Sequence, residues 1–176
     1  MAAPVPVVVG RLPGHRETEP NNSTDSALIL AWPSAIHGHI SEADDEDRFG
    51  IEAVKGDKLR LRLRASEFDS ALDPVLRIED TNGKQLARDD DSGERQDAKL
   101  NWTAPADGMY FLAVSDLIRS GSKAHFYRLE IDRITPSIDA TFTPDRLVVE
   151  AGKSVEATVI IGFADGYKGT PAVVVR

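Results

Sequence analysis

The stretch KLRLRLR, residues 58–64, decides the fold class of this chain. Leucine and a basic residue alternate strictly along it, and this period of two places all the leucines on one side of a strand but not of a helix. The stretch therefore predicts a β-strand whose leucine face is buried. Its opposite face carries Lys58, Arg60, Arg62 and Arg64.

The same period of two recurs on both sides of this stretch. It runs through residues 49–53 and 125–132, while residues 109–114 are apolar throughout, as expected of a central strand. Turn-forming pairs such as Asn82-Gly83 separate these segments, and Asn-Gly is typical of a tight hairpin because both residues tolerate positive φ. No window of a dozen residues carries a helical stripe. We therefore expect an all-β chain folded as a sandwich.

A domain boundary is expected at residues 134–137, where the sequence reads ITPS. We interpret residues 1–15 as a strand or linker from a preceding region and residues 16–136 as the sandwich. Residues 137–176 also read as strands, but they are too few for a sandwich of about 100 residues. They are either the opening strands of a truncated second β domain or strands that complete the first one.

Composition and motifs argue against several function classes. The chain has 29 acidic and 21 basic residues and a formal net charge of −8, a field that opposes nucleic acids and anionic membranes. Cysteine is absent, which excludes disulfides and thiolate chemistry. The apolar run at residues 2–9 is too short to span a bilayer and lacks the basic leader of a signal peptide. The sequence contains no nucleophile elbow, zinc-protease motif or phosphate-binding loop, so we expect no enzyme.

Two acidic segments are candidate metal ligands. In ETEPNN, residues 17–22, Pro20 disfavours a helix, so Glu17, Glu19 and Asn21 project to one side of an extended segment. The second segment, EADDED, spans residues 42–47. If the two adjoin, Glu17 and Glu19 meet Asp44 and Asp47, and a hard cation such as Ca²⁺ would be needed to offset their repulsion. The alternative for each segment is a solvated acidic loop.

A third acidic run begins at residue 89 and reads DDDSGE. Its glycine is one position too early for an EF-hand loop. A second oxygen site is one interpretation, and a solvated hairpin loop is the other. The candidate ligands are Asp73, Asp89, Asp90 and Asp91.

The cationic face of residues 58–64 also has two interpretations. It is either a docking strip for an anionic partner, such as an acidic polysaccharide or protein, or an exposed sheet face whose basic residues pair with carboxylates on neighbouring strands. The strip consists of Lys58, Arg60, Arg62 and Arg64.

A series of motifs resembles the bacterial pre-peptidase C-terminal domain. The motifs follow one another in the order found in that domain and cover roughly residues 16–133. The resemblance implies a jelly-roll-like antiparallel β-sandwich, without catalytic residues, found in secreted or cell-surface proteins. Residues 148–155 resemble the early strands of an Ig-like module. The motifs are Glu17-x-Glu19-Pro20-Asn21-Asn22, Gly38-x-Ile40, Asp44-x-x-Asp47-x-Phe49, Leu72-Asp73-Pro74-x-Leu76, Asn82-Gly83, Asp89-Asp90, Ala106-Asp107-Gly108-x-Tyr110 and Tyr127-x-Leu129.

The resemblance also implies a site and a role. Collagen-binding domains of bacterial collagenases are similar and hold Ca²⁺ near the start of the domain. The role implied is that of a spacer or substrate-targeting module beside the neighbouring domains of a larger protein, with a collagen-like protein fibre or a polysaccharide as the ligand. A metal-dependent hydrolase is the remaining alternative. The ligands carried over are Glu17, Glu19, Asn21, Asn22, Gly38, His39, Asp44 and Asp47, with His39 contributing only its carbonyl oxygen.

Overall fold

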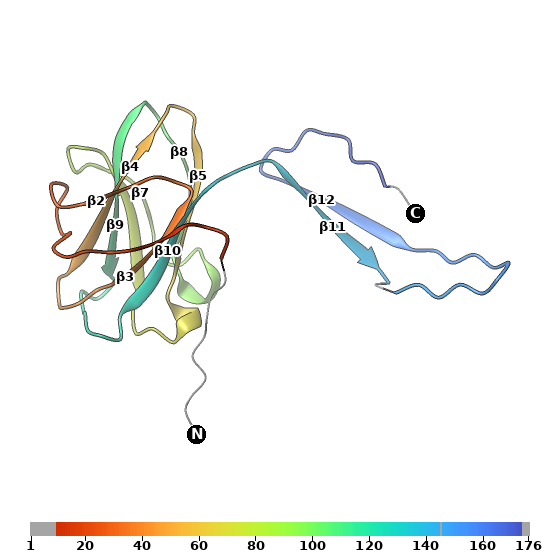
Figure 1. Ribbon diagram of the computed structural model, residues 1–176, viewed down its shortest axis with the longest axis horizontal. Coiled ribbons are helices and arrows are strands. Elements are labelled where there is room, and N and C mark those ends of the chain that lie inside the picture. Colours follow the sequence, from red (N-terminus) through yellow and green to blue (C-terminus); the bar gives the residue numbers. More distant parts are fainter. Residues whose placement is uncertain (1–9, 145, 174–176) are drawn as a thin grey trace, which may run out of the picture. The chain divides into compact units, whose positions relative to one another are not determined.

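The computed structural model describes residues 10–144 and 146–173 (Figure 1). The chain forms two compact units, and the boundary between them in the sequence lies between Arg133 and Ile134. The strand expected within residues 2–9 lies outside the described residues. No helix in the described part of the chain is long and apolar enough to span a bilayer.

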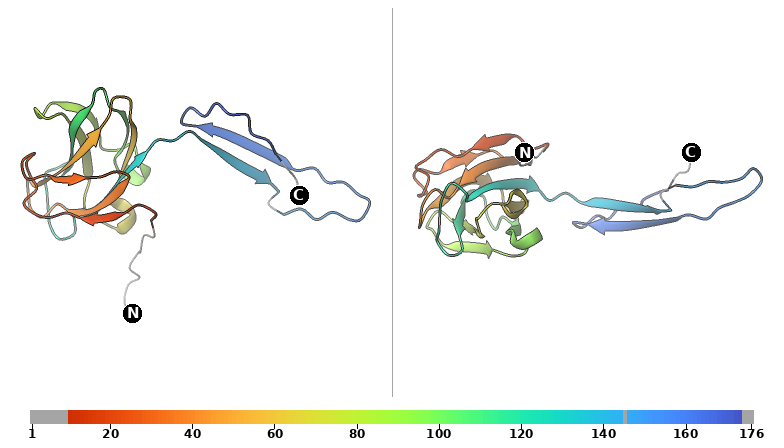
Figure 2. Two further views of the ribbon diagram at one scale, coloured as in Figure 1. Left: turned by 45° about the horizontal axis from the view of Figure 1, so that its top comes forward. Right: turned by 90° about the horizontal axis from the view of Figure 1, so that it is seen from below.

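The first unit is a sandwich of two five-stranded sheets, which face one another in Figures 1 and 2. In spatial order, the first sheet contains β1 (Gly14–Arg16), β3 (Ser34–His39), β10 (Phe126–Arg133), β5 (Lys58–Arg64) and β8 (Lys99–Thr103). The second contains β2 (Leu28–Leu30), β4 (Glu46–Ala53), β9 (Gly108–Asp116), β6 (Pro74–Glu79) and β7 (Gln85–Asp89). Two short 3-10 turns, η1 (Ser66–Phe68) and η2 (Glu94–Gln96), lie in the connections. The predicted β-sandwich is confirmed.

The sheets are mixed rather than wholly antiparallel, which corrects the sequence prediction at two edges. The three-residue edge strands β1 and β2 pair in parallel with β3 and β4. The reason is connectivity. The chain alternates between the two sheets from β1 to β4, so another strand lies between each edge strand and its partner. A hairpin would impose antiparallel pairing, but neither edge strand is joined to its partner by one.

Alternation along the strands builds the core. Leu59, Leu61 and Leu63 of β5 are at most 1% exposed, as the repeat at residues 58–64 predicts. They pack in one cluster with inward residues of the other sheet, such as Phe49 and Leu112. Each such side chain contributes about 1.5–3 kcal/mol through burial. The core therefore depends on both sheets and fixes which face of every strand points outward.

The second unit is a single antiparallel pair formed by β11 (Ser137–Thr143) and β12 (Thr158–Ala164). Within the described residues these strands pair only with one another, so they do not extend either sheet of the sandwich. Every residue of β11 is exposed. Residues 146–150 are not in a strand, although the sequence of residues 137–176 reads as strands. As far as the structure describes it, the unit is a hairpin without a buried core of its own.

Candidate metal centre

Three carboxylates from two distant parts of the chain meet at one end of the sandwich. One oxygen each from Glu17, Glu19 and Asp47 lies within 4.8 Å of the other two. Asp47 belongs to β4, whereas Glu17 directly follows β1 and continues its ladder through a 3.1 Å hydrogen bond from its N–H to the His37 carbonyl. The cluster therefore joins the first sheet to the second.

Asp47 is fully buried and is held by a tyrosine that the sequence analysis did not select. The Tyr127 hydroxyl donates to Asp47 Oδ2 at 2.5 Å and approaches Glu17 Oε2 at 3.5 Å. Asp47 Oδ1 has no hydrogen-bond partner within the described residues. The alternation along β10 already indicates that the Tyr127 side chain points into the core. A buried phenol needs a hydrogen-bond acceptor there, and this requirement could have identified Tyr127.

Gly38 makes room for this contact. A β-carbon at Gly38 would overlap the Tyr127 hydroxyl and ring end and would lie 2.6 Å from Glu17 Oε2. The glycine in Gly38-x-Ile40 therefore contributes space for this contact. The adjacent residue, His39, donates a main-chain hydrogen bond to the Glu17 carboxylate.

Asn21 is the second buried polar group of the centre. Its N–H donates to Glu19 Oε2 at 2.9 Å, and its carbonyl accepts from the Arg48 N–H at 3.0 Å. The side chain is fully buried, yet among the residues described neither Oδ1 nor Nδ2 has a partner. A buried polar group without a hydrogen-bond partner lowers the free energy of unfolding by about 1–3 kcal/mol. Amide and carboxylate oxygens are the ligand types that Ca²⁺ prefers, so the residues present fit the expected ion.

Burial and mutual repulsion keep the cluster partly protonated without a cation. Burial, followed by the hydrogen bond and the charge of Asp47, raises the pKa of Glu17 to about 9. Burial also raises the pKa of Asp47 to about 6, although hydrogen bonds from Glu17 and Tyr127 oppose the shift. The pKa of Tyr127 is raised by burial and by both carboxylates, so the phenol stays a donor. A divalent cation would compete with the proton for these oxygens.

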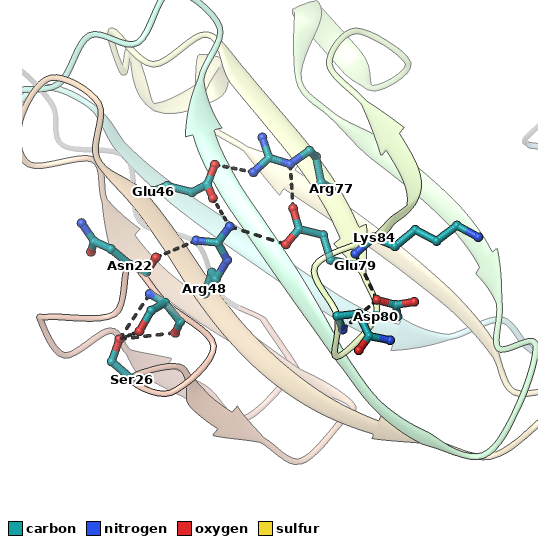
Figure 3. Close-up of polar contacts among 10 residues, drawn as sticks. Asn22, Ser26, Glu46, Arg48, Arg77, Glu79, Asp80 and Lys84 are labelled. Atoms are coloured by element: carbon teal, nitrogen blue, oxygen red, sulfur yellow. Dashed lines mark hydrogen bonds and ion pairs between the residues drawn. The ribbon is translucent and has the colours of Figure 1, made fainter.

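An ion-pair network on the outer face of the second sheet anchors the segment that carries Asn21 (Figure 3). Arg48 Nη1 donates to the Asn22 carbonyl at 2.6 Å, and Arg48 Nη2 lies 2.5 Å from Glu46 Oε1 and 3.5 Å from Glu79 Oε2. Arg77 closes the network by pairing with Glu46 and, at 3.1 Å, with Glu79.

The network forms because a small residue separates its two arginines. Arg48 on β4 and Arg77 on β6 both lie opposite Ala113 of β9 in the sheet register. The short alanine side chain leaves space for guanidinium and carboxylate groups to meet above it. Since Asp47 precedes Arg48 and points inward, the network fixes the strand that presents this carboxylate.

The other expected ligands of this site lie apart from the cluster. Asn22 is exposed and uses its carbonyl to bind Arg48. The Asp44 side chain is 71% exposed and lies 3.4 Å from Arg119. Asp45 is buried instead, and its carboxylate accepts from the Ser41 N–H at 2.6 Å and the Ser41 hydroxyl at 3.0 Å. Of the eight expected ligands, the structure brings together Glu17, Glu19, Asn21 and Asp47, with Gly38 and His39 alongside.

The third acidic run forms a turn. Asp89 accepts hydrogen bonds from the Ser92 N–H at 3.1 Å and the Lys99 N–H at 2.7 Å. Asp90 pairs with Arg88 at 2.8 Å, and Asp91 is exposed. Within the described residues, Asp73 and these aspartates do not form a group close enough to hold a metal ion. The geometry matches a solvated loop, although this loop joins β7 and β8 of different sheets and is not part of a hairpin.

The cationic strip lies on the outer face of the first sheet. Lys58 is exposed, and Arg60 Nε donates to Asn101 Oδ1 at 3.3 Å. Arg62 and Arg64 share Glu130 of β10 at 3.6 and 3.1 Å. The cross-strand pairing that the sequence left open is therefore present for part of the strip.

Comparisons with known proteins give one relative in sequence. No family model matches the chain. Over 100 residues it is 38% identical to a "Probable subtilase-type serine protease" of Deinococcus radiodurans, a match that covers 55% of this chain and 14% of that protein. The chain thus spans a small part of the length of this curated relative.

Solved structures with a similar arrangement include two kinds of small domain. One is the pre-peptidase C-terminal domain of a Bacillus anthracis collagenase, at a TM-score of 0.45 and 13% identity, covering 66% of this chain and 99% of that one. Another is PliG of Aeromonas hydrophila, a periplasmic inhibitor of g-type lysozyme. Its TM-score is 0.47 and its sequence identity 12%, and the match covers 61% of this chain and 95% of that one.

Proposed function

We propose that this chain is a non-catalytic accessory domain of a larger exported protein of the protease type, in which Ca²⁺ holds the N-terminal segment against the sandwich. The sequence match to part of a subtilase-type protease supports the parent class. The motif resemblance supports the accessory role and a secreted or cell-surface location. Binding to a collagen-like fibre stays a prediction.

One observation carries the calcium proposal. Three carboxylates from two separate segments converge, and one of them, Asp47, is fully buried, as is the side chain of Asn21 next to Glu19; both have an unsatisfied side-chain oxygen within the described residues. Such an arrangement is unfavourable by itself, because the charges repel in a medium of low dielectric constant. Calcium would neutralise the charge and supply a partner for these oxygens.

The ion would act as a clamp. Glu17 and Glu19 lie in the connection that leaves β1, and Asp47 lies near the start of β4 in the second sheet. Joining them fixes the position at which the preceding chain reaches the sandwich. An accessory domain with this clamp would hold a neighbouring domain in a defined orientation, which is the function of a spacer.

Thermal unfolding in calcium and in EGTA tests the proposal. A ligand at a hundred times its Kd stabilises the folded state by about 2.7 kcal/mol, which raises Tm by about 5–10 °C. We expect this rise for the unmodified chain and its loss in Glu19→Gln, a substitution at an exposed ligand that keeps the side-chain shape.

The matched control is Glu52→Gln. Glu52 is exposed and lies on the same strand as Asp47 but on the outward face. It should keep the full calcium response, because the variant changes the net charge equally without touching the cluster. Superimposable unfolding curves of the unmodified chain in calcium and EGTA would reject the clamp.

A further inference from the structure

The outward side chains of β5 and β8 form a polar surface that the calcium clamp does not use, which we term the β5–β8 face. In the sheet register, Arg62 lies opposite Lys99, and Arg60 lies opposite Asn101. None of these outward residues is acidic or apolar, although the chain as a whole carries a net charge of −8. The face consists of Lys58, Arg60, Arg62, Arg64, Lys99, Asn101 and Thr103.

The neighbouring strand β10 offsets part of this charge, since its Asp132 lies opposite Arg60 and its Glu130 lies opposite Arg62 in the sheet register. Its Glu130 is 6% exposed and accepts from Arg128 at 2.9 Å and Arg64 at 3.1 Å, with Arg62 at 3.6 Å. Three guanidinium groups thus share one carboxylate. The side chain of Arg62 remains 50% exposed, so its charge is available to a ligand.

A cavity of about 590 Å³ opens beside the Arg62 end of this face, within the size range of ligand sites. Arg62, Arg64, Arg95 and Lys99 line it together with the hydroxyl-bearing Ser66 and Ser92.

The acidic residues of the lining are already engaged within the protein. Asp97 accepts from the N–H groups of Ala65 and Ser66 at 3.1 and 2.9 Å, and Glu67 accepts from Arg64 at 2.7 Å. With Glu130 also bound by arginines, the cavity presents a surplus of cationic donors together with hydroxyl groups.

We propose that the β5–β8 face and its cavity bind a carboxylated polysaccharide. Regularly spaced carboxylates complement basic side chains that lie about 4.8 Å apart across strands and about 7 Å apart along a strand. The sugar hydroxyls complement the exposed Ser92 and Asn101. Protein partners usually need a buried apolar or aromatic centre, and single-stranded nucleic acids need stacking aromatics. The outward residues of β5 and β8 offer neither.

Isothermal titration of the full chain with polygalacturonate tests the proposal. The unmodified chain should bind at low salt, and the affinity should fall as salt is raised. The double variant Arg62→Gln/Lys99→Gln should bind about tenfold more weakly, because each partly exposed charge contact contributes modestly. The control is Lys55→Gln/Lys84→Gln, which removes the same charge from exposed lysines outside the face and should bind normally. Thermal unfolding confirms that both variants fold.

Three outcomes would overturn the proposal. The first is no binding of polygalacturonate by the unmodified chain at low salt. The second is an equal loss of affinity in both double variants, which would show a non-specific charge effect. The third is binding of polyglutamate or single-stranded DNA that is as tight as that of polygalacturonate. None of these results depends on calcium, so the proposal is tested separately from the clamp.

Discussion

The cluster of Glu17, Glu19 and Asp47 and the loop that follows β7 are both rich in carboxylates, but their oxygens are satisfied in different ways. Asp47 is buried, has one oxygen without a partner in the described part of the chain, and faces two further acidic groups. Asp89 in the loop receives two main-chain N–H groups.

The pKa values express this difference. Burial, and the hydrogen bond and charge of Asp47, raise the pKa of Glu17 to about 9. Burial alone would also raise the pKa of Asp89, but hydrogen bonds from Ser92 and Lys99 outweigh it and hold the pKa below its usual value. The comparison teaches that hydrogen-bond donors, here the Ser92 hydroxyl and two main-chain N–H groups, determine whether a carboxylate group needs a cation more than the count of acidic residues does.

The largest expected effect comes from filling the space at Gly38. Gly38→Ala should lower the free energy of unfolding by about 3 kcal/mol, since the added β-carbon overlaps Tyr127 and crowds Glu17. Chemical denaturation in EGTA measures the loss, and the calcium response should disappear with it. Gly14→Ala is the control, because a β-carbon at Gly14 meets nothing within 4 Å. Equal stability of the two variants would contradict the close packing of the cluster.

The next effect is a dependence on pH. Because the folded-state pKa of Glu17 is raised above its unfolded value, folding favours the protonated form, and this stability is complete below pH 4.5 and is lost as the pH rises toward 9. In EGTA, the free energy of unfolding should fall by at least about 1.4 kcal/mol across this range, the equivalent of one pKa unit. Denaturation series at several pH values measure it, and calcium or Glu17→Gln should flatten the profile.

The Asp89 loop should behave in the opposite way. Its lowered pKa means that its contribution is present above the unfolded pKa and is lost as the pH falls through the folded value. Asp89→Asn should lower the free energy of unfolding by about 1 kcal/mol at pH 7 and by less in acid. The variant should show the same calcium-induced rise in Tm as the unmodified chain. A calcium response that vanished in this variant would place a functional ion in the loop instead.

The smallest expected effect concerns the network in Figure 3. Arg48→Gln removes the 2.6 Å contact with the Asn22 carbonyl and should weaken calcium binding about threefold, because a partly exposed charged contact is worth less than about 1 kcal/mol. Titration calorimetry measures the affinity. Arg77→Gln disturbs the same network without contacting Asn22 and should leave the affinity unchanged. Equal affinities of both variants would remove Arg48 as a positioning residue.

The strands and part of the site could be predicted from sequence because both depend on local periodicity. The alternation at residues 58–64 specifies its own buried face, and the alternation of Glu17 and Glu19 selects two carboxylates that do converge. The position of the Asp44 side chain could not be predicted from periodicity. Asp44 adopts a positive φ of 63° in a turn and points to Arg119, a contact set by the tertiary structure.

Contacts between strands distant in the sequence account for most of what was missed. Tyr127 is separated from Asp47 by 80 positions, and the Arg48–Arg77 network depends on both strands flanking Ala113. The parallel edges arise in the same way, from the order in which the chain visits the two sheets. Periodicity identifies a strand and its inner face but not its neighbours.

The short strand β1 has a mechanical consequence. In the register of the first sheet, Gly14 at the start of β1 and Glu130 near the end of β10 both lie opposite Ala35, so the chain reaches and leaves the sandwich at the same end of one sheet. Tension applied through both attachments would peel β1 away one rung at a time instead of shearing its whole length. A bound ion at Glu17 would stand directly behind those three rungs as the first strong resistance to extension.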